Sequence, residues 1–344
     1  MEAKSKKART LMHIGVVLGT VAAAAIVAAC SSEESKDESK DEGIGLTQLE
    51  PVANATEASD PVDATPSPDG SSIYFIAFST QPGPDGIGSI KVPAIYKAIP
   101  GATPQKLHEG EPLNSPFNIT ISDDGQRLFI ADSSADENTS EDGADRSDGR
   151  VFVMGTTGGR PTVLAGTEGI APAGVEAMGD SLFVTGRKDG LAGVFKTGIG
   201  GGQASIVKTG APFSDPGGIA VSKKGEIYVV DTGSAMAGQS LASVIRVMPD
   251  GSTEVIADGF AVGHPAGIAL SADEGSVLIS ALDAAEGTDR VHRIQLGDRS
   301  VGTLKDKIGE FYESAGLHRA RNANVFAWAD SHANGHGTVY MLKP

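Results

Sequence analysis

Cysteine is almost absent from this 344-residue sequence, in which Cys30 is the single example. A disulfide within the chain and a cluster of thiolate metal ligands are therefore excluded. Basic residues are also scarce, because 28 Lys and Arg stand against 44 Asp and Glu and give a net charge of −16. Nucleic-acid binding needs a basic patch, so no nucleic-acid partner is expected. Aromatic residues make up only 5% of the chain, which leaves few rings to stack on sugars.

Several familiar catalytic signatures are missing as well. The chain contains no G-x-S-x-G elbow, no phosphate-binding loop and no H-E-x-x-H pair. After residue 45, no segment keeps a helical period. Short apolar runs bounded by Gly, Pro, Asp and Ser recur instead, and this pattern predicts an all-β chain.

The N-terminus has the layout of a secretory signal. Four basic residues lie within the first nine, and an apolar stretch follows over 11–29. The segment Val27-Ala28-Ala29-Cys30 resembles a bacterial lipobox. This resemblance implies cleavage of the signal peptide 1–29 and diacylation, including palmitate, at Cys30. The alternatives are an ordinary signal peptide or a single membrane anchor.

Residues 30–45 are predicted to form an acidic, disordered tether. The sequence SSEESKDESKDEG after Cys30 has no apolar residue and cannot bury enough surface to fold. Ser31, rather than Asp, follows the cysteine, which is similar to outer-membrane lipoproteins. We therefore expect a lipoprotein of the cell envelope, in the outer membrane, held there by its lipid anchor.

A repeat occupies the rest of the chain. Each copy is an apolar strand, a turn rich in Gly or Asp, and a second apolar strand. The six copies lie at 61–77, 116–132, 172–186, 216–231, 265–281 and 314–330. Two further short strands follow each copy, except that the sixth unit ends after its third strand.

A period near 50 residues with four strands per unit is typical of a β-propeller. The segment 46–55 reads as the fourth strand that the sixth unit lacks, and pairing with the C-terminal strand would close the ring. We therefore predict that 46–344 forms an all-β, six-bladed propeller of four-stranded blades.

The P-x-G-I-A-[VL]-S repeat resembles NHL-repeat proteins and the gluconolactonase/senescence-marker propellers, which are TolB-like in architecture. The gluconolactonase group binds a divalent cation in its channel and acts on lactones. The residues at the middle position of the aligned P-x-G motif, which would match its ligands, carry no side-chain oxygen here; they are Val62, Phe117, Ala173, Gly217, Ala266 and Ala315. The E-G-P match, Glu109 to Pro112, contains an inserted residue. The resemblance therefore implies the fold, and enzymatic activity is not expected.

Charged residues at the ends of second strands are candidates for ligand binding. Asp132, Asp231 and Asp330 end such strands, although Asp330 stands one residue out of register, and Arg187 follows another. A ring of carboxylates at the channel mouth would bind a cation or a basic group. The alternative is that each Asp caps its strand by accepting hydrogen bonds from backbone N–H groups.

One aligned position of the first strands holds Glu176 in the third unit and His318 in the sixth. Blades three and six lie across the ring from one another, so these residues could face each other as a catalytic acid–base pair. The alternative is that His318 and the adjacent Arg319 belong to a solvated last blade.

Two segments are candidates for binding a divalent cation. The loop 131–150 holds Asp136, Asp142 and Asp148, but it lacks the spacing of a calcium loop. His332 and His336 lie four residues apart, a spacing at which two imidazoles can share zinc. The alternatives are a solvated acidic insertion and a polar loop.

These observations predict a membrane-anchored, extracytoplasmic propeller that binds a protein or a small-molecule ligand. Two alternatives stay open. One is a lactonase-like or other hydrolase with a rearranged site, and the other is a cation-binding envelope protein.

Overall fold

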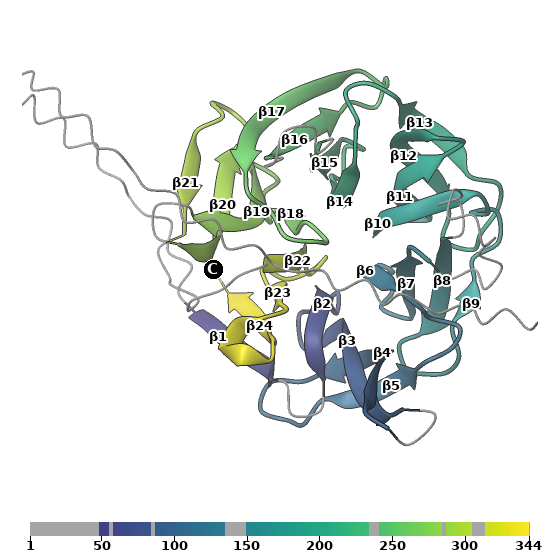
Figure 1. Cartoon of the computed structure of the whole chain (residues 1–344). Coiled ribbons are helices and arrows are strands. Elements are labelled where there is room, and N and C mark those ends of the chain that lie inside the picture. Colours follow the sequence, from purple (N-terminus) through teal and green to yellow (C-terminus); the bar gives the residue numbers. More distant parts are fainter. Residues whose placement is uncertain are drawn as a thin grey trace, which may run out of the picture. The chain divides into compact units, whose positions relative to one another are not determined.

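The computed structural model describes residues 48–54, 58–83, 87–134, 149–233, 241–283, 287–304 and 314–343. Within these residues the chain forms six sheets of four antiparallel strands each, arranged as a ring around one axis, the channel axis of the propeller (Figure 1). This arrangement confirms the predicted six-bladed propeller. The proposed signal peptide, Cys30 and the tether lie outside the described residues.

Every blade runs from an inner strand at the channel to an outer strand at the rim. Blade 1 comprises β2 (Ser59–Pro66), β3 (Ile73–Pro82), β4 (Ser89–Ala98) and β5 (Gln105–Glu109). Blade 2 comprises β6 (Pro116–Ile121), β7 (Arg127–Asp132), β8 (Arg150–Gly155) and β9 (Thr162–Val163). Blade 3 comprises β10 (Ile170–Met178), β11 (Ser181–Lys188), β12 (Leu191–Gly198) and β13 (Ser205–Thr209).

The last three blades follow the same order. Blade 4 comprises β14 (Pro216–Val221), β15 (Ile227–Asp231), β16 (Ala242–Val247) and β17 (Thr253–Phe260). Blade 5 comprises β18 (Ile268–Leu270), β19 (Ser276–Asp283), β20 (Thr288–Gln295) and β21 (Val301–Thr303). Blade 6 comprises β22 (Ser314–Arg319), β23 (Phe326–Asp330) and β24 (Thr338–Lys343), and its outer strand is β1 (Gln48–Asn54).

The ring closes through the two ends of the propeller chain. Strand β1 pairs antiparallel with β24, so that Gln48 lies opposite Lys343 and Asn54 lies opposite Thr338. The sixth blade therefore takes its outer strand from the start of the domain and its inner three from the end. This pairing confirms the closure predicted from 46–55, and it ties the first and last blades together.

The core is divided among the six interfaces between neighbouring blades. Each interface holds one cluster of buried aliphatic and aromatic side chains. The second strands are buried on both faces because each is packed between two blades; for example, β7 is buried from Leu128 to Asp132. Burial of one such large apolar side chain stabilises a fold by about 1.5–3 kcal/mol.

The hairpin turns between first and second strands repeat one design. In the first blade the Ser67 hydroxyl donates to Asp69, and Gly70 adopts a φ of +72°. The second blade has the same arrangement at Ser122, Asp124 and Gly125. The fifth differs from the sequence pattern, because Glu274 rather than Gly275 occupies the left-handed position, at a φ of +56°.

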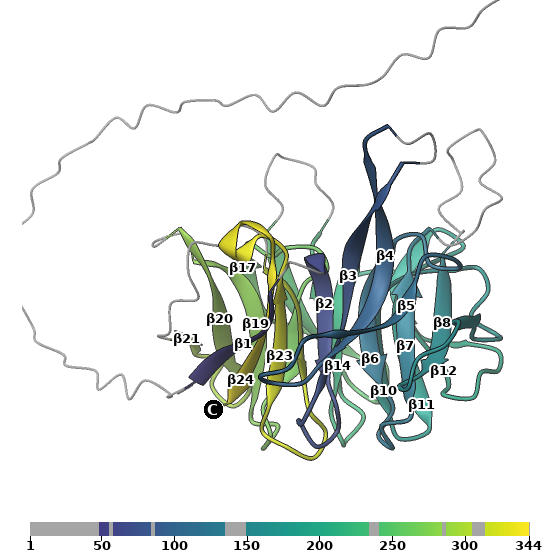
Figure 2. The same ribbon diagram turned by 90° about the horizontal axis from the view of Figure 1, so that it is seen from below.

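The two ends of the channel carry different connections. We call the end with the first-to-second strand turns the hairpin face. The opposite end, where second strands connect to third strands, is the loop face. Strands β3 and β4 extend beyond the ring on the loop face as a two-stranded arm (Figure 2).

Candidate functional site

Two aligned positions of the inner strands place side chains at the channel. The first holds Asp63 and Asn118 in blades 1 and 2 and glycine in the other four blades. The second, two residues later, holds Thr65, Thr120, Glu176, Ala220, Ala269 and His318. Polar side chains therefore concentrate on blades 1, 2, 3 and 6, whereas blades 4 and 5 present only small apolar groups.

His318 lies at the centre of this polar half and is almost fully buried. Its Nε2 atom lies 3.1 Å from Oδ2 of Asp63, and its Nδ1 atom lies 3.6 Å from Oε2 of Glu176. The structure thus brings Glu176 and His318 together, as their positions in the third and sixth repeats predicted. Both ring nitrogens already face carboxylates, and a catalytic role for the pair stays a prediction.

Asp63 connects three blades. Its Oδ2 atom accepts a hydrogen bond from the backbone N–H of Ile119 at 2.7 Å and another from the Asn118 amide at 2.6 Å, both in blade 2. The same atom contacts His318 in blade 6. Asn118 extends the chain of contacts, because its Oδ1 atom accepts a hydrogen bond from the N–H of Val175 in blade 3 at 2.7 Å.

Sequence reasoning did not identify Asp63 or Asn118 as site residues. The signal was nevertheless present, because they replace glycine at a position where four of six repeats have it. Gly316 shows why most repeats have glycine at this position: a Cβ atom there would overlap the carboxylate of Asp63. A polar side chain at this position, where the other repeats have glycine, can therefore reach the neighbouring blade.

Glu176 is held from two further sides. Arg321, which follows the inner strand of blade 6, contacts its Oε1 atom at 2.7 Å, and Thr120 donates to its Oε2 atom at 3.0 Å. Arg321 also contacts Asp123 in the blade 2 hairpin, with Nε 3.1 Å from Oδ1. Arg321 was not predicted, because it lies in a turn outside the aligned strands.

Two members of this network, His318 and Glu176, have shifted pKa values. Burial alone would lower the pKa of His318, but Asp63 and Glu176 raise it to about 10. Burial likewise opposes ionisation of Glu176, yet Arg321 and His318 lower its pKa below the ordinary value. An efficient acid–base catalyst needs a pKa near the working pH. At neutral pH, His318 is therefore an imidazolium that holds two carboxylates.

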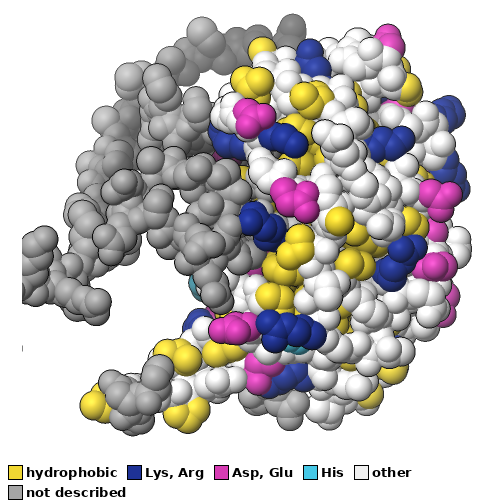
Figure 3. All heavy atoms as spheres, turned by 90° about the vertical axis from the view of Figure 1, so that its right-hand side faces the viewer, with side chains coloured by type: hydrophobic (Ala, Val, Ile, Leu, Met, Phe, Trp, Pro, Cys, Tyr) yellow, Lys and Arg dark blue, Asp and Glu magenta, His cyan; other side chains and the backbone are white. Residues whose placement is uncertain are grey.

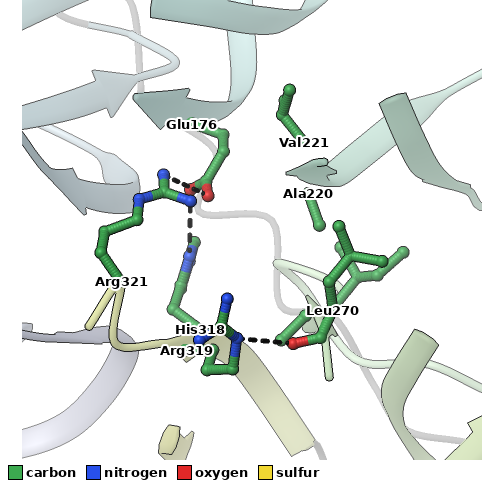
Figure 4. Close-up of a pocket in the computed structure, with 9 residues that line it drawn as sticks. Glu176, Ala220, Val221, Leu270, His318, Arg319 and Arg321 are labelled. Atoms are coloured by element: carbon green, nitrogen blue, oxygen red, sulfur yellow. Dashed lines mark hydrogen bonds and ion pairs between the residues drawn. The ribbon is translucent and has the colours of Figure 1, made fainter. Parts of the chain in front are cut away.

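A small pocket adjoins the network in the channel. One wall consists of Glu176, His318, Arg319 and Arg321, and the other consists of Ala220, Val221, Ile268, Ala269 and Leu270. Figure 4 shows the charged side chains on one side and the small apolar ones across from them. The apolar wall comes from blades 4 and 5, which carry alanine where blades 3 and 6 carry Glu176 and His318.

Three predicted ligand-binding carboxylates lie on the loop face at equivalent positions. Asp132, Asp231 and Asp330 each pair with the first residue of the inner strand of their own blade, so Asp330 is in register after all. Each carboxylate accepts backbone hydrogen bonds, for example from Asn114 and Ser115 to Asp132 at 2.8 and 3.0 Å. The geometry matches the capping alternative, and ligand binding by these groups stays a prediction.

Arg187 connects two blades on the same face. Its guanidinium donates to the carbonyl of Ser214, which precedes the inner strand of blade 4. The side chain also lies 3.9 Å from Oδ1 of Asp215. Arg187 is therefore placed at the loop face with part of its hydrogen-bonding capacity committed to the neighbouring blade.

Asp330 differs from its two counterparts in its surroundings. Burial raises the pKa of Asp330 to about 7, and the nearby charge of Asp289 adds to the effect. Its Oδ2 atom is buried and has no hydrogen-bond partner among the residues that the structure describes. Because the folded pKa exceeds the ordinary value of 3.8, the folded state holds a proton that the unfolded state has lost between about pH 4 and 7.

This difference predicts how Asp330→Asn changes the pH dependence of stability. The contribution of wild-type Asp330 is full below about pH 4 and falls as pH rises through about 7, whereas the asparagine of the variant does not titrate. The free energy of unfolding of the variant, minus that of the wild type, should therefore rise between about pH 5 and pH 8. Urea unfolding at several pH values across this range measures it, and a constant difference would contradict the prediction.

The candidate cation sites fall into two groups. Asp136, Asp142 and Asp148 lie outside the described residues. His332 and His336 flank the short 3-10 helix η1 (Ala333–Gly335), and Nδ1 of His332 lies 2.9 Å from the Ser331 hydroxyl. Within the part of the chain that the structure describes, no three His, Cys, Asp or Glu side chains gather in a way that could hold a metal ion.

Across the described ranges, no helix is long and apolar enough to cross a membrane. No protein-family model matches the chain, and no curated protein is significantly similar to it in sequence.

Solved structures do resemble the propeller. TolB from Acinetobacter baumannii superposes with a TM-score of 0.53 at 14% identity, covering 72% of this chain and 55% of that one. This chain thus spans about half the length of that TolB chain. A nidogen/laminin complex matches with a TM-score of 0.50 at 13% identity, covering 78% of this chain and 85% of that one. At such identities the likeness concerns the fold alone, and it confirms the predicted TolB-like propeller architecture.

Proposed function

We propose that this protein is a lipid-anchored propeller of the bacterial cell envelope that binds a partner protein through its loop face. The observation that carries the proposal is a set of exposed apolar side chains where second strands connect to third strands. Ile87 is 79% exposed and Ile90 41% exposed on the β3–β4 arm. Leu191, the first residue of β12, and Leu241, which precedes β16, are exposed at the corresponding positions of blades 3 and 4.

These side chains are placed for contact with another protein. Figure 3 shows hydrophobic side chains towards the end of an arm that projects beyond the ring. Large apolar groups on an extended arm gain free energy when a partner removes them from water. The nidogen/laminin complex, which shares the fold, is itself an assembly of proteins.

The envelope location rests on the N-terminal sequence. The lipobox-like segment ending at Cys30 and the acidic spacer 30–45 precede β1, which begins at Gln48. A spacer of this length would separate an anchored propeller from the membrane surface and leave its faces accessible. TolB-like architecture is in keeping with this location.

The charged network favours binding over acid–base catalysis. Asp63, Glu176, His318 and Arg321 satisfy one another, and the raised pKa of His318 prevents it from accepting a proton at neutral pH. The hydrolase alternative therefore has less support than the binding module.

Site-specific photocrosslinking tests the proposed face. With a photoreactive amino acid in place of Ile87, we expect one discrete adduct with an envelope protein in cells that produce the full chain. The matched control is the same replacement at Ile206, which is 63% exposed on outer strand β13. Absence of an adduct at position 87, or the same adducts at both positions, would contradict the proposal.

A further inference from the structure

The pocket beside the charged network is small and lies towards the hairpin face. It lies where the inner strands of blades 4, 5 and 6 end, because Val221, Leu270 and Arg319 are the last residues of β14, β18 and β22. The cavity volume is about 20 Å³. One or two water molecules, or a single monatomic ion, occupy a space of this size. Larger ligands are therefore excluded by volume alone.

Three cations line the described wall of this pocket, and one of them lacks a carboxylate partner. His318 and Arg321 both contact Glu176, and each also contacts a second carboxylate. Among the described residues, Arg319 forms no ion pair. Its hydrogen bonds go to main-chain carbonyls instead.

These bonds use only part of the Arg319 guanidinium. Its Nε atom lies 2.9 Å from Leu270 O, and its Nη1 atom lies 2.6 Å from Ala320 O. The third nitrogen, Nη2, makes no hydrogen bond within the part of the chain that the structure describes. Figure 4 shows the guanidinium beside His318, on the charged side of the pocket. Its remaining N–H groups are therefore available to a ligand.

The charged groups that meet at the pocket have one positive charge in excess. They are three cations and two carboxylates: His318, Arg319, Arg321, Glu176 and Asp63. Two further carboxylates lie nearby but outside the wall. The Asp123 side chain is 42% exposed, so solvent screens its charge. Glu274 accepts a hydrogen bond from the Lys223 N–H, and it raises the pKa of Arg319 by its charge without forming an ion pair with it.

The other wall distinguishes an anion from a water molecule. Its side chains have no hydrogen-bonding groups; they are Ala220, Val221, Ile268, Ala269 and Leu270. A buried water usually forms about three hydrogen bonds, and these side chains provide none. A chloride ion is only slightly larger than a water molecule. It needs donors and positive charge on one side, and it tolerates contact with methyl groups on the other.

We propose that this pocket binds a single chloride ion, held by the guanidinium of Arg319 and in contact with the methyl groups of Ala220 and Ala269. Hydrogen bonds from a charged donor to an anion are roughly twice as strong as neutral ones. The bound ion would join the ends of the inner strands of blades 4, 5 and 6. The inference goes beyond the proposed protein-binding face and does not depend on it.

Broadening of the chloride NMR line measures this binding directly. With the full-length chain in a nonionic detergent and sodium chloride as the probe, we expect excess broadening that added bromide removes. The dissociation constant should be on the order of 50 mM, in keeping with a ligand of one heavy atom. Sulfate and acetate at the same ionic strength should leave the broadening in place, because they exceed the volume of the pocket. The net charge of −16 keeps non-specific attraction of chloride small.

Variants locate the site. Arg319→Met should weaken chloride binding by about tenfold or more, while Arg319→Lys, which keeps the charge, should weaken it less. Ala220→Val should also remove the excess broadening, because it fills the pocket and leaves Arg319 in place. The matched control is Arg299→Met, because Arg299 is exposed on the fifth blade and pairs only with Glu254 among the described residues; this variant should bind chloride as the wild type does.

Two results would overturn the proposal. One is the same excess broadening by Arg319→Met as by the unaltered chain. The other is an unaltered chain that shows no broadening removable by bromide, since water alone would then occupy the pocket, or one whose broadening sulfate removes as well as bromide does. The second result needs no variant, so it decides the matter even where a substitution prevents folding. Failure here would leave the crosslinking at Ile87 unaffected, since that residue lies on the opposite face.

Discussion

Replacing Asp63 with alanine is expected to lower the free energy of unfolding by about 3–5 kcal/mol. Asp63 is fully buried, and its carboxylate accepts hydrogen bonds from Asn118 and Ile119 and faces the imidazolium of His318. The substitution leaves a buried positive charge without its nearest partner and a buried N–H group without an acceptor. Both losses carry large free-energy costs.

Urea unfolding followed by circular dichroism measures this effect. Asp63→Asn should cost less, since it keeps an acceptor for Ile119 while removing the charge. The matched control is Asp250→Ala, which removes an exposed carboxylate from a turn between β16 and β17 and should leave the unfolding midpoint nearly unchanged. Equal midpoints for Asp63→Ala and Asp250→Ala would show that the network contributes little to stability.

Gly218→Ala is expected to be the second severe substitution, at about 3 kcal/mol of destabilisation. A Cβ atom at Gly218 in blade 4 would overlap the carbonyl oxygen of Ala266 and lie 3.0 Å from the carbonyl carbon of the same residue. These atoms belong to the backbone leading into blade 5, so no side-chain rotation can relieve the overlap. The two blades would have to move apart.

The control for this prediction is Gly302→Ala. Gly302 lies on outer strand β21, and a Cβ atom there would meet no atom within 4 Å. This change should alter the free energy of unfolding by less than about 0.5 kcal/mol. If Gly218→Ala were as mild as Gly302→Ala, the close approach of blades 4 and 5 would not be a constraint on the fold.

The fold was predictable because the sequence features that indicate it recur in every repeat. The spacing of the six repeats, the turn residues at Asp69-Gly70 and Asp124-Gly125, and the unpaired segment 46–55 each predicted one feature of the closed ring. A repeat register also placed Glu176 and His318 in opposite blades. These are properties of the alternation of strands and turns, which one sequence displays directly.

The site was only partly predictable because it depends on contacts between blades. The aligned repeats show that Asp63 and Asn118 replace a glycine found in the other four repeats, but they do not show that Asp63 contacts Ile119 and His318. Arg319 and Arg321 lie within the sixth repeat, yet only the ring brings them close to Glu176, Ala220 and Ala269. Asp132, by contrast, bonds within its own blade, which is why its capping alternative was visible in the sequence.

Crosslinking at position 87, compared between the otherwise unaltered chain and Cys30→Ser, tests the envelope-binding proposal most directly. The account predicts a single adduct that sediments with membranes when Cys30 is present. In Cys30→Ser the propeller should leave the membrane fraction, because the lipid anchor is lost. Retention of Cys30→Ser in membranes, or the same adducts at position 87 as at position 206, would contradict a lipid-anchored module that binds its partner through the loop face.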